Sequence, residues 1–278
     1  MSVAADMRDW RPHARWLPGD RWTARLVVVA ALLFAASTAA TIVWCASMSA
    51  MPAMPMPGGW TMSMAWMRMP GQTWPGAAAS FVGMWTVMMA AMMMPSLVPM
   101  LVGYRRAVGE RGGRRLERLT ALVGAGYFVV WIALGVAVYP LGVALAGVEM
   151  RQAALSRLAP IAVGAIVLLA GVVQLTGWKA RQLSCCRGAP GPGRAIAADT
   201  GAAWRHGLRL GLRCAACCGG LMAILLVTGV MDLRAMVVVT AAITVERLAP
   251  AGRRAARAVG VVAVAAGLVL LVRAAVLG

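Results

Sequence analysis

Sulfur-bearing side chains are the residues of this 278-residue chain best suited to chemistry, and they fall into three groups. Eight methionines lie between residues 48 and 69, and six more between residues 84 and 94. Five of the six cysteines lie far downstream, after residue 184. Thioethers and thiolates are soft ligands that select Cu(I) over Mg or Ca. With two histidines and nine carboxylates, harder ions have few ligands, so the sequence predicts Cu(I), with zinc as the alternative.

The downstream cysteines form a loop pair, Cys185 and Cys186, and a triad, Cys214, Cys217 and Cys218. Positions three and four apart share one face of a helix, so Cys214 can converge with both Cys217 and Cys218. A reducing cytosol keeps such cysteines as thiols, and neighbouring arginines favour the thiolate that binds metal. We interpret both groups as candidate ligands. The alternative is that they are small apolar side chains at a close helix contact.

The methionines form two further candidate ligand sets. In the first, Met54 and Met56 are two residues apart, as are Met62 and Met64, close enough for one ion. The second set is a stripe on a helix, where neighbours are three and four residues apart; it contains Met88, Met89, Met92 and Met93. Such a stripe could relay a soft metal inward. The alternative is flexible apolar packing, a common use of methionine.

The elements that must position these residues are membrane-spanning helices. The chain is 61% hydrophobic and 13% charged, and a span needs ~20 mostly apolar residues. Seven spans are predicted, with six as the fallback: 26–47, 78–103, 119–147, 158–177, 210–230, 233–248 and 258–276. The fold class is therefore an all-α polytopic transmembrane helix bundle. A basic cytoplasmic tail, 1–25, precedes this single bundle, and a methionine-rich external loop, 48–70, follows the first span.

Arginines set the predicted orientation, because positively charged loops stay in the cytoplasm. Their numbers alternate between high and low from the tail through the successive loops. The N-terminus is therefore predicted to be cytoplasmic and the C-terminus extracytoplasmic, with Arg247, at the end of the span 233–248, counted among the arginines of the last inner connection. The same distribution accounts for the net charge of +18 through contacts with anionic lipids, so no nucleic-acid partner is expected.

The remaining polar residues offer little chemistry. Glu246 is expected near the membrane surface, paired with neighbouring arginines, and Cys45 is read as a packing residue. The sequence has no paired-carboxylate site, no Ser-His-Asp arrangement and no phosphate-binding loop. We therefore expect no enzyme activity.

Several of these motifs together resemble the DUF2182 family of bacterial membrane proteins. The resemblance covers roughly residues 80 to 250. Its motifs are Trp85 with the methionine stripe and Pro95, Gly126-Tyr127 with Trp131, Gln174 with Lys179, the cysteine triad, Gly229 to Leu233, and Glu246 with Pro250. The chain departs from the family pattern at Gly219 and in the spacing of Cys185 and Cys186. The resemblance implies a multi-pass protein of the bacterial inner (cytoplasmic) membrane with a metal-binding role.

The predicted function is soft-metal handling in a membrane, by transport or by delivery to a membrane cuproenzyme. External methionines would capture Cu(I), the stripe would relay it, and the cysteine triad would bind it at the inner face. Expected partners are membrane lipids, the metal ion and a metallochaperone or cuproenzyme. Two alternatives stay open: a membrane thiol–disulfide oxidoreductase, and a structural subunit of a membrane complex without metal.

Overall fold

A computed structural model describes residues 21–50, 54–68, 71–109, 113–187 and 199–277 of the chain. The described part is almost entirely helical. Its helices are α1 (Arg21–Ser49), α2 (Trp74–Val108), α3 (Gly113–Arg151), α4 (Ala153–Leu175), α5 (Gly177–Arg187), α6 (Thr200–Thr228), α7 (Leu233–Leu248) and α8 (Gly252–Leu277). A small hairpin, β1 (Met54–Met56) and β2 (Trp60–Met62), and a 3-10 turn, η1 (Met64–Trp66), lie between α1 and α2. The all-α bundle predicted from the sequence is confirmed.

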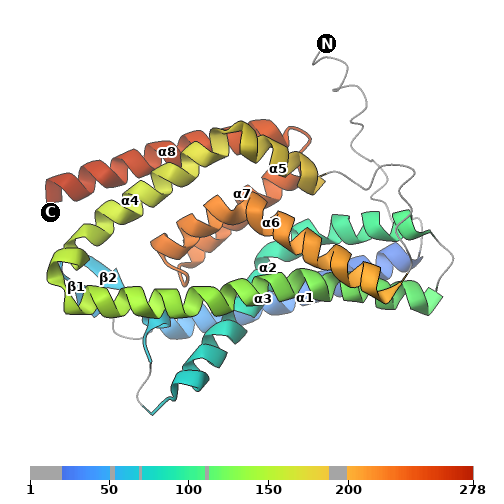
Figure 1. Cartoon of the computed structure of the whole chain (residues 1–278), viewed down its shortest axis with the longest axis horizontal. Helices are drawn as coiled ribbons and strands as arrows, with labels where there is room; N and C mark the ends of the chain where they lie inside the picture. The colour runs from blue at the N-terminus through green and yellow to red at the C-terminus, as the bar shows by residue number, and fades with distance from the viewer. Residues whose placement is uncertain (1–20, 51–53, 69–70, 110–112, 188–198, 278) are drawn as a thin grey trace, which may run out of the picture.

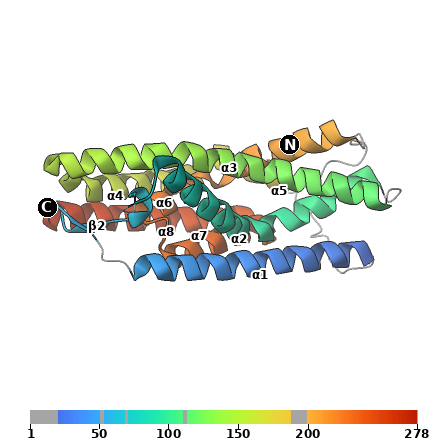
Figure 2. The ribbon, with the colours of Figure 1, turned by 90° about the horizontal axis from the view of Figure 1, so that it is seen from below.

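The long helices form one elongated bundle in which the chain alternates direction (Figure 1). The start of α1 and the end of α8 lie at opposite ends, and the β1–β2 hairpin lies at the same end as the C-terminal end of α8 (Figure 2). In the described residues, six helices are long and apolar enough to cross a membrane: α1, α2, α3, α4, α6 and α8. The chain is therefore a multi-pass membrane protein.

Helix α7 is the short member of the bundle. It covers the predicted span 233–248 and has 16 residues, which extend for about 24 Å, less than the ~30 Å of a hydrocarbon core. The additional helix α5 lies in a segment predicted to be a loop. The other helices begin before their predicted spans, because hydropathy locates only the part that lies in hydrocarbon. Helix α6, for example, begins ten residues before 210.

Side-chain caps fix where the helices that carry the site begin. Thr73 accepts a hydrogen bond from the amide of Gly76 and starts α2. Asp199 accepts one from Ala202 and starts α6. Asp232 accepts from two amides in the first turn of α7. These residue types satisfy amides that have no partner within the helix, so the register of the three helices is specified locally.

Glycines allow helices α3 and α6 to pack closely. A Cβ at Gly126 would lie 2.9 Å from the carbonyl oxygen of Trp204, and one at Gly211 would lie 2.8 Å from that of Tyr127. Small residues at such contacts allow helix backbones to approach in membranes. The α3–α6 contact therefore depends on the absence of side chains at these positions, and it brings the first half of α3 against the first half of α6.

The polar and aromatic interior lies among α2, α3, α6 and α7, while the outer surface is apolar. Trp85 on α2 is 2% exposed and donates its indole N–H to the carbonyl of Trp131 on α3, at 2.8 Å. Outward-facing side chains such as Val43, Leu141 and Val272 are more than half exposed. So many exposed apolar residues would be unusual for a protein in water, and they suit contact with lipid.

Candidate soft-metal site

The cysteine triad lies in the middle of helix α6. Cys214, Cys217 and Cys218 are all buried, with at most 3% exposure. The sequence placed them at the start of a span, at the inner face. Because α6 begins at Thr200, about 21 Å of helix precedes Cys214. The arginine-rich first half of α6 is thus helical and continuous with the apolar half that carries the triad.

Helices α2, α3 and α6 meet at Cys214. Its Sγ lies 3.8 Å from Sδ of Met93 on α2 and 2.9 Å from the hydroxyl oxygen of Tyr127 on α3. Met93 and Tyr127 are both fully buried. The methionine stripe and the cysteine triad, which are 121 residues apart at this contact, therefore meet in the core.

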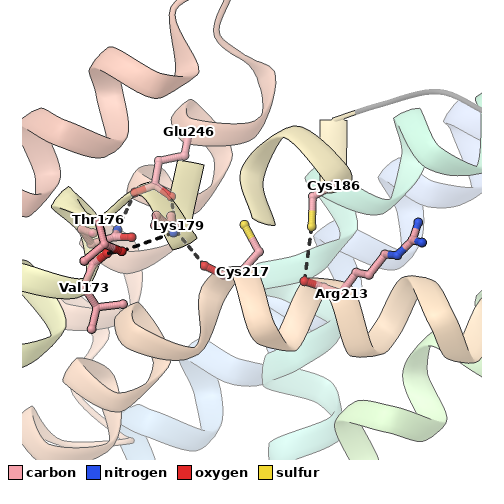
Figure 3. A network of polar contacts seen from close by, with 8 residues as sticks. Val173, Thr176, Lys179, Cys186, Arg213, Cys217 and Glu246 are labelled. Atoms are coloured by element: carbon pink, nitrogen blue, oxygen red, sulfur yellow. Dashed lines mark hydrogen bonds and ion pairs between the residues drawn. The ribbon is translucent and has the colours of Figure 1, made fainter. Parts of the chain in front are cut away.

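The other thiols continue from Cys214 as a chain of pairwise contacts. Cys218 interacts with both Cys214 and Cys217, and Cys217 interacts with Cys186 on α5. Cys186 also donates its thiol hydrogen to the carbonyl oxygen of Arg213 at 3.2 Å (Figure 3). The hydrogen-bonding contact with Cys217 and burial both raise the pKa of Cys186 above its ordinary value.

A buried ion pair connects α5 and α7 beside the triad. Lys179 Nζ lies 2.8 Å from Oε2 of Glu246 and donates to the carbonyl oxygen of Cys217 at 2.7 Å. Gln174 on α4 donates to Oε1 of Glu246 at 2.6 Å. Figure 3 shows Lys179 between Glu246 and Cys217. The expectation that Glu246 pairs with arginines near the membrane surface was wrong. Glu246 is 2% exposed and pairs with Lys179, because α5 packs against α7 and places this lysine in the core.

Arg247 is a buried cation facing the thiols. It is 7% exposed, and its guanidinium lies within reach of the Cys214 sulfur, although no hydrogen bond to it meets strict geometry among the described residues. The groups that interact most strongly with its charge are Cys218, Cys214, Tyr127 and Cys186. The charge pattern counted Arg247 with the inner loop that follows the predicted span 233–248, although it lies inside that span; in the structure α7 contains it and directs it inward.

The four methionines predicted as a stripe are all in the core. Met88, Met89, Met92 and Met93 are at most 2% exposed. They form a buried row on α2 that ends, in the direction of the chain, at the contact of Met93 with Cys214. Two prolines, Pro95 and Pro99, follow inside the same helix.

The hairpin methionines and Cys185 are separate from this site. Met54, Met56 and Met62 pack with Trp60, Trp66 and Ala146 in a small cluster at the hairpin end. Met64 instead lines a cavity against α2. Cys185 is exposed, although its neighbour Cys186 is buried. The structure thus brings together Cys186, the triad and Met93, but it brings neither the hairpin nor Cys185 to them.

The described residues contain no group of three His, Cys, Asp or Glu side chains arranged to hold one metal ion. The thiols meet in pairs, and the further sulfur at Cys214 is the thioether of Met93. Thiolate and thioether ligands suit both Cu(I) and zinc, but structural zinc takes four ligands in a tetrahedron, and the described residues show no such group. The donor set therefore fits Cu(I) better than zinc.

A family model matches residues 82–270, and its description is PpoB2, copper chaperone. This chain belongs to the PpoB2 family. The match contains the stripe, Tyr127, Lys179, the triad, Glu246 and Arg247, and it begins after the methionine-rich loop. It does not carry the DUF2182 name, so that resemblance stays a prediction. No curated protein and no solved structure matches the chain. Family and fold together support a role in copper handling at a membrane.

Three residues of this PpoB2 protein contribute to the site in ways that the sequence did not show. Tyr127 and Lys179 appeared only among the motifs of the family resemblance, and Arg247 was counted as a loop charge. Each lies on a different helix from the triad. Of the three, only Arg247 could have been recognised from the sequence. It lies next to Glu246 within the apolar span, and two ionisable residues in a membrane helix suggest a functional site.

Proposed function

We propose that this chain is a membrane copper chaperone that holds Cu(I) between the thiolate of Cys214 and the thioether of Met93. Cys218 and Cys217 are the next ligands along α6. The observation that carries the proposal is the 3.8 Å contact between Cys214 Sγ and Met93 Sδ. Two sulfurs that share one metal at bond lengths of about 2.3 Å, as in zinc thiolates, lie at most about 4.6 Å apart. The observed separation falls within that limit.

The charges around the triad support a thiolate site. A buried guanidinium without a partner is strongly destabilising unless an anion lies nearby. Arg247 faces Cys214 and Cys218, and the Tyr127 hydroxyl can donate to the Cys214 sulfur. Cu(I) bound by the Cys214 thiolate and the Met93 thioether is neutral, and once Cys218 binds as a second thiolate the site has a net charge of −1, which Arg247 would balance. Binding would release the thiol protons.

The chain of sulfur contacts supports transfer of the ion. Each sulfur from Met93 through Cys214, Cys218 and Cys217 to Cys186 contacts the next. A Cu(I) ion can therefore exchange one ligand at a time and never lose all its sulfur partners. The Cys186 end lies on α5, outside the long helices, and a protein partner that receives copper would dock near it.

The test is Cu(I) binding by the detergent-purified protein, measured by competition with a coloured Cu(I) chelator. A variant with Cys214, Cys217 and Cys218 replaced by serine should lose one equivalent of tightly bound Cu(I), and Met93→Leu should weaken that equivalent at least tenfold. Cys185→Ser is the matched control, because this thiol is exposed, and it should bind as the wild type does. Unchanged copper binding in the serine variant would contradict the proposal.

A further inference from the structure

We propose a second Cu(I) site, built from thioethers, near the N-terminal end of α2. It occupies a cavity of about 210 Å³ that is lined by five methionines, Met48, Met64, Met67, Met84 and Met231. Of the five, Met64 was a predicted ligand and Met48 and Met67 belong to the same methionine-rich stretch, whereas the sequence provided no reason to group Met84 or Met231 with them. The predicted hairpin methionines, Met54, Met56 and Met62, lie elsewhere.

The five methionines reach the cavity from different parts of the chain. Met48 is in the last turn of α1, Met64 and Met67 are in and just after η1, and Met84 is on α2. Met231 comes from the turn between α6 and α7, and the thiol of buried Cys45 lies 3.9 Å from its Sδ. The abundance of methionine in the loop does not account for this arrangement, because Met84 and Met231 lie outside the loop and converge on the same space.

The cavity lining is suited to a soft, singly charged ion. Its other residues include Trp44, Phe81 and Tyr139, with Gln72 and Ser80 as polar side chains. Its described lining has no carboxylate and no histidine, so Mg, Ca or Zn would find few suitable ligands. Thioethers have no proton to lose, so this site, unlike the thiol site, would bind Cu(I) without releasing protons.

The position of the cavity connects it with the copper site at Cys214. Met84 lines the cavity and begins the row Met84, Met88, Met92 on one face of α2, with Met93 beside it. Met84 and Met93 are nine residues apart, about 14 Å along the helix. The buried side chains of Met88, Met89 and Met92 place sulfur atoms between them. Transfer of the ion from the cavity to Cys214 rests on the function proposed above. Binding of Cu(I) in the cavity is independent of that function.

The test compares two triple variants of the full-length protein in detergent. The cavity variant replaces Met48, Met67 and Met231 with leucine; the matched control replaces Met54, Met56 and Met62 with leucine. Leucine and methionine have similar volumes and are both apolar, and thermal unfolding verifies that each variant folds. We expect the cavity variant to lose one of two Cu(I) equivalents and the control to lose none.

A third protein, with the three α6 cysteines replaced by serine, separates this site from the thiol site. It should keep one Cu(I) equivalent, with an affinity that is the same at pH 5 and pH 7. Equal copper binding by the cavity variant and the wild type would overturn the second site, as would an equal loss in the hairpin control. If the serine variant binds as much copper as the wild type, the Cys214 site is contradicted. The cavity site is then tested by the two leucine variants alone.

Discussion

At the scale of single residues, the site is defined by polar groups buried among sulfurs. Arg247 is the most informative of them, because a buried guanidinium is costly unless it is paired, and the side chain within its reach is the thiol of Cys214. It faces two thiols of the triad and the hydroxyl of Tyr127. A cation in this position stabilises thiolates, and thiolates are the form of cysteine that binds metal.

Replacement of Arg247 should therefore affect copper binding more than folding. We expect Arg247→Met to weaken Cu(I) binding at the triad by about 1–3 kcal/mol, the size of one lost charge-assisted interaction, and Arg247→Lys to restore part of it. Chelator competition at constant pH measures the effect. Arg254→Met, at an exposed position, is the control. Equal affinity in Arg247→Met and wild type would show that the guanidinium does not support the thiolates.

At the scale of elements, the site depends on how closely α3 and α6 approach each other. Gly207 and Gly211 lie against the backbone of α3, one to two turns before Cys214. The contact of Tyr127 with Cys214 follows from this approach, because the two residues lie on the facing sides of the two helices. Gly219 is on the same helix, and a Cβ there would have nothing within 4 Å.

Gly207 and Gly219 give a matched pair of substitutions. Gly207→Ala would place a Cβ against the backbone of Val123, so we expect it to destabilise the protein by ~1–3 kcal/mol, as overpacking does, and to weaken Cu(I) binding as Tyr127 moves away. Gly219→Ala should be neutral or stabilising by up to ~1 kcal/mol, because alanine favours helix. Thermal unfolding in detergent compares them. An equal effect of both substitutions would contradict the role of the α3–α6 contact.

The Lys179–Glu246 pair joins α5 and α7 and reaches α6 through the carbonyl of Cys217. Lys179→Met leaves the carboxylate of Glu246 buried without its cation, so we expect a loss of ~3–5 kcal/mol in the free energy of unfolding. The double variant Lys179→Met, Glu246→Gln should recover a large part of that loss. A double variant less stable than Lys179→Met would contradict the pairing.

At the scale of the whole molecule, the charge pattern predicts which face is cytoplasmic. The alternation of arginine-rich and arginine-poor connections places the α5 end inside and the hairpin end outside. In the described structure these segments lie toward different parts of the bundle (Figure 1). Copper would then enter from the hairpin end and leave at the Cys186 end.

Labelling of single cysteines in cells tests this orientation. In a chain whose other cysteines are serine, exposed Cys185 should react with a membrane-impermeant maleimide only after the membrane is opened. With all native cysteines replaced, Thr61→Cys, at an exposed hairpin position, should react in intact cells. Labelling of Cys185 in intact cells, together with protection of position 61, would reverse the orientation.

The sequence by itself determined the class of fold and the kind of chemistry. Apolar runs of membrane-spanning length must become helices in lipid, because every backbone polar group needs an internal partner. Sulfur ligands in such numbers point to a soft metal whatever their arrangement. Helix spacing also predicted that the members of the triad and of the stripe would each share a face. These inferences depend only on local periodicity and on the types of side chain.

Only the tertiary structure decided which of these residues meet. Cys214 contacts Met93 because α2 and α6 both pack against α3 and α7, and Arg247 turns inward because α7 packs against the same core. Met48, Met67 and Met231 surround a cavity, whereas Met54, Met56 and Met62 pack within the hairpin cluster, although the two sets have the same residue type. Helix contacts in a membrane are set by close packing between distant segments. The local periodicity of the sequence does not indicate which segments pack together.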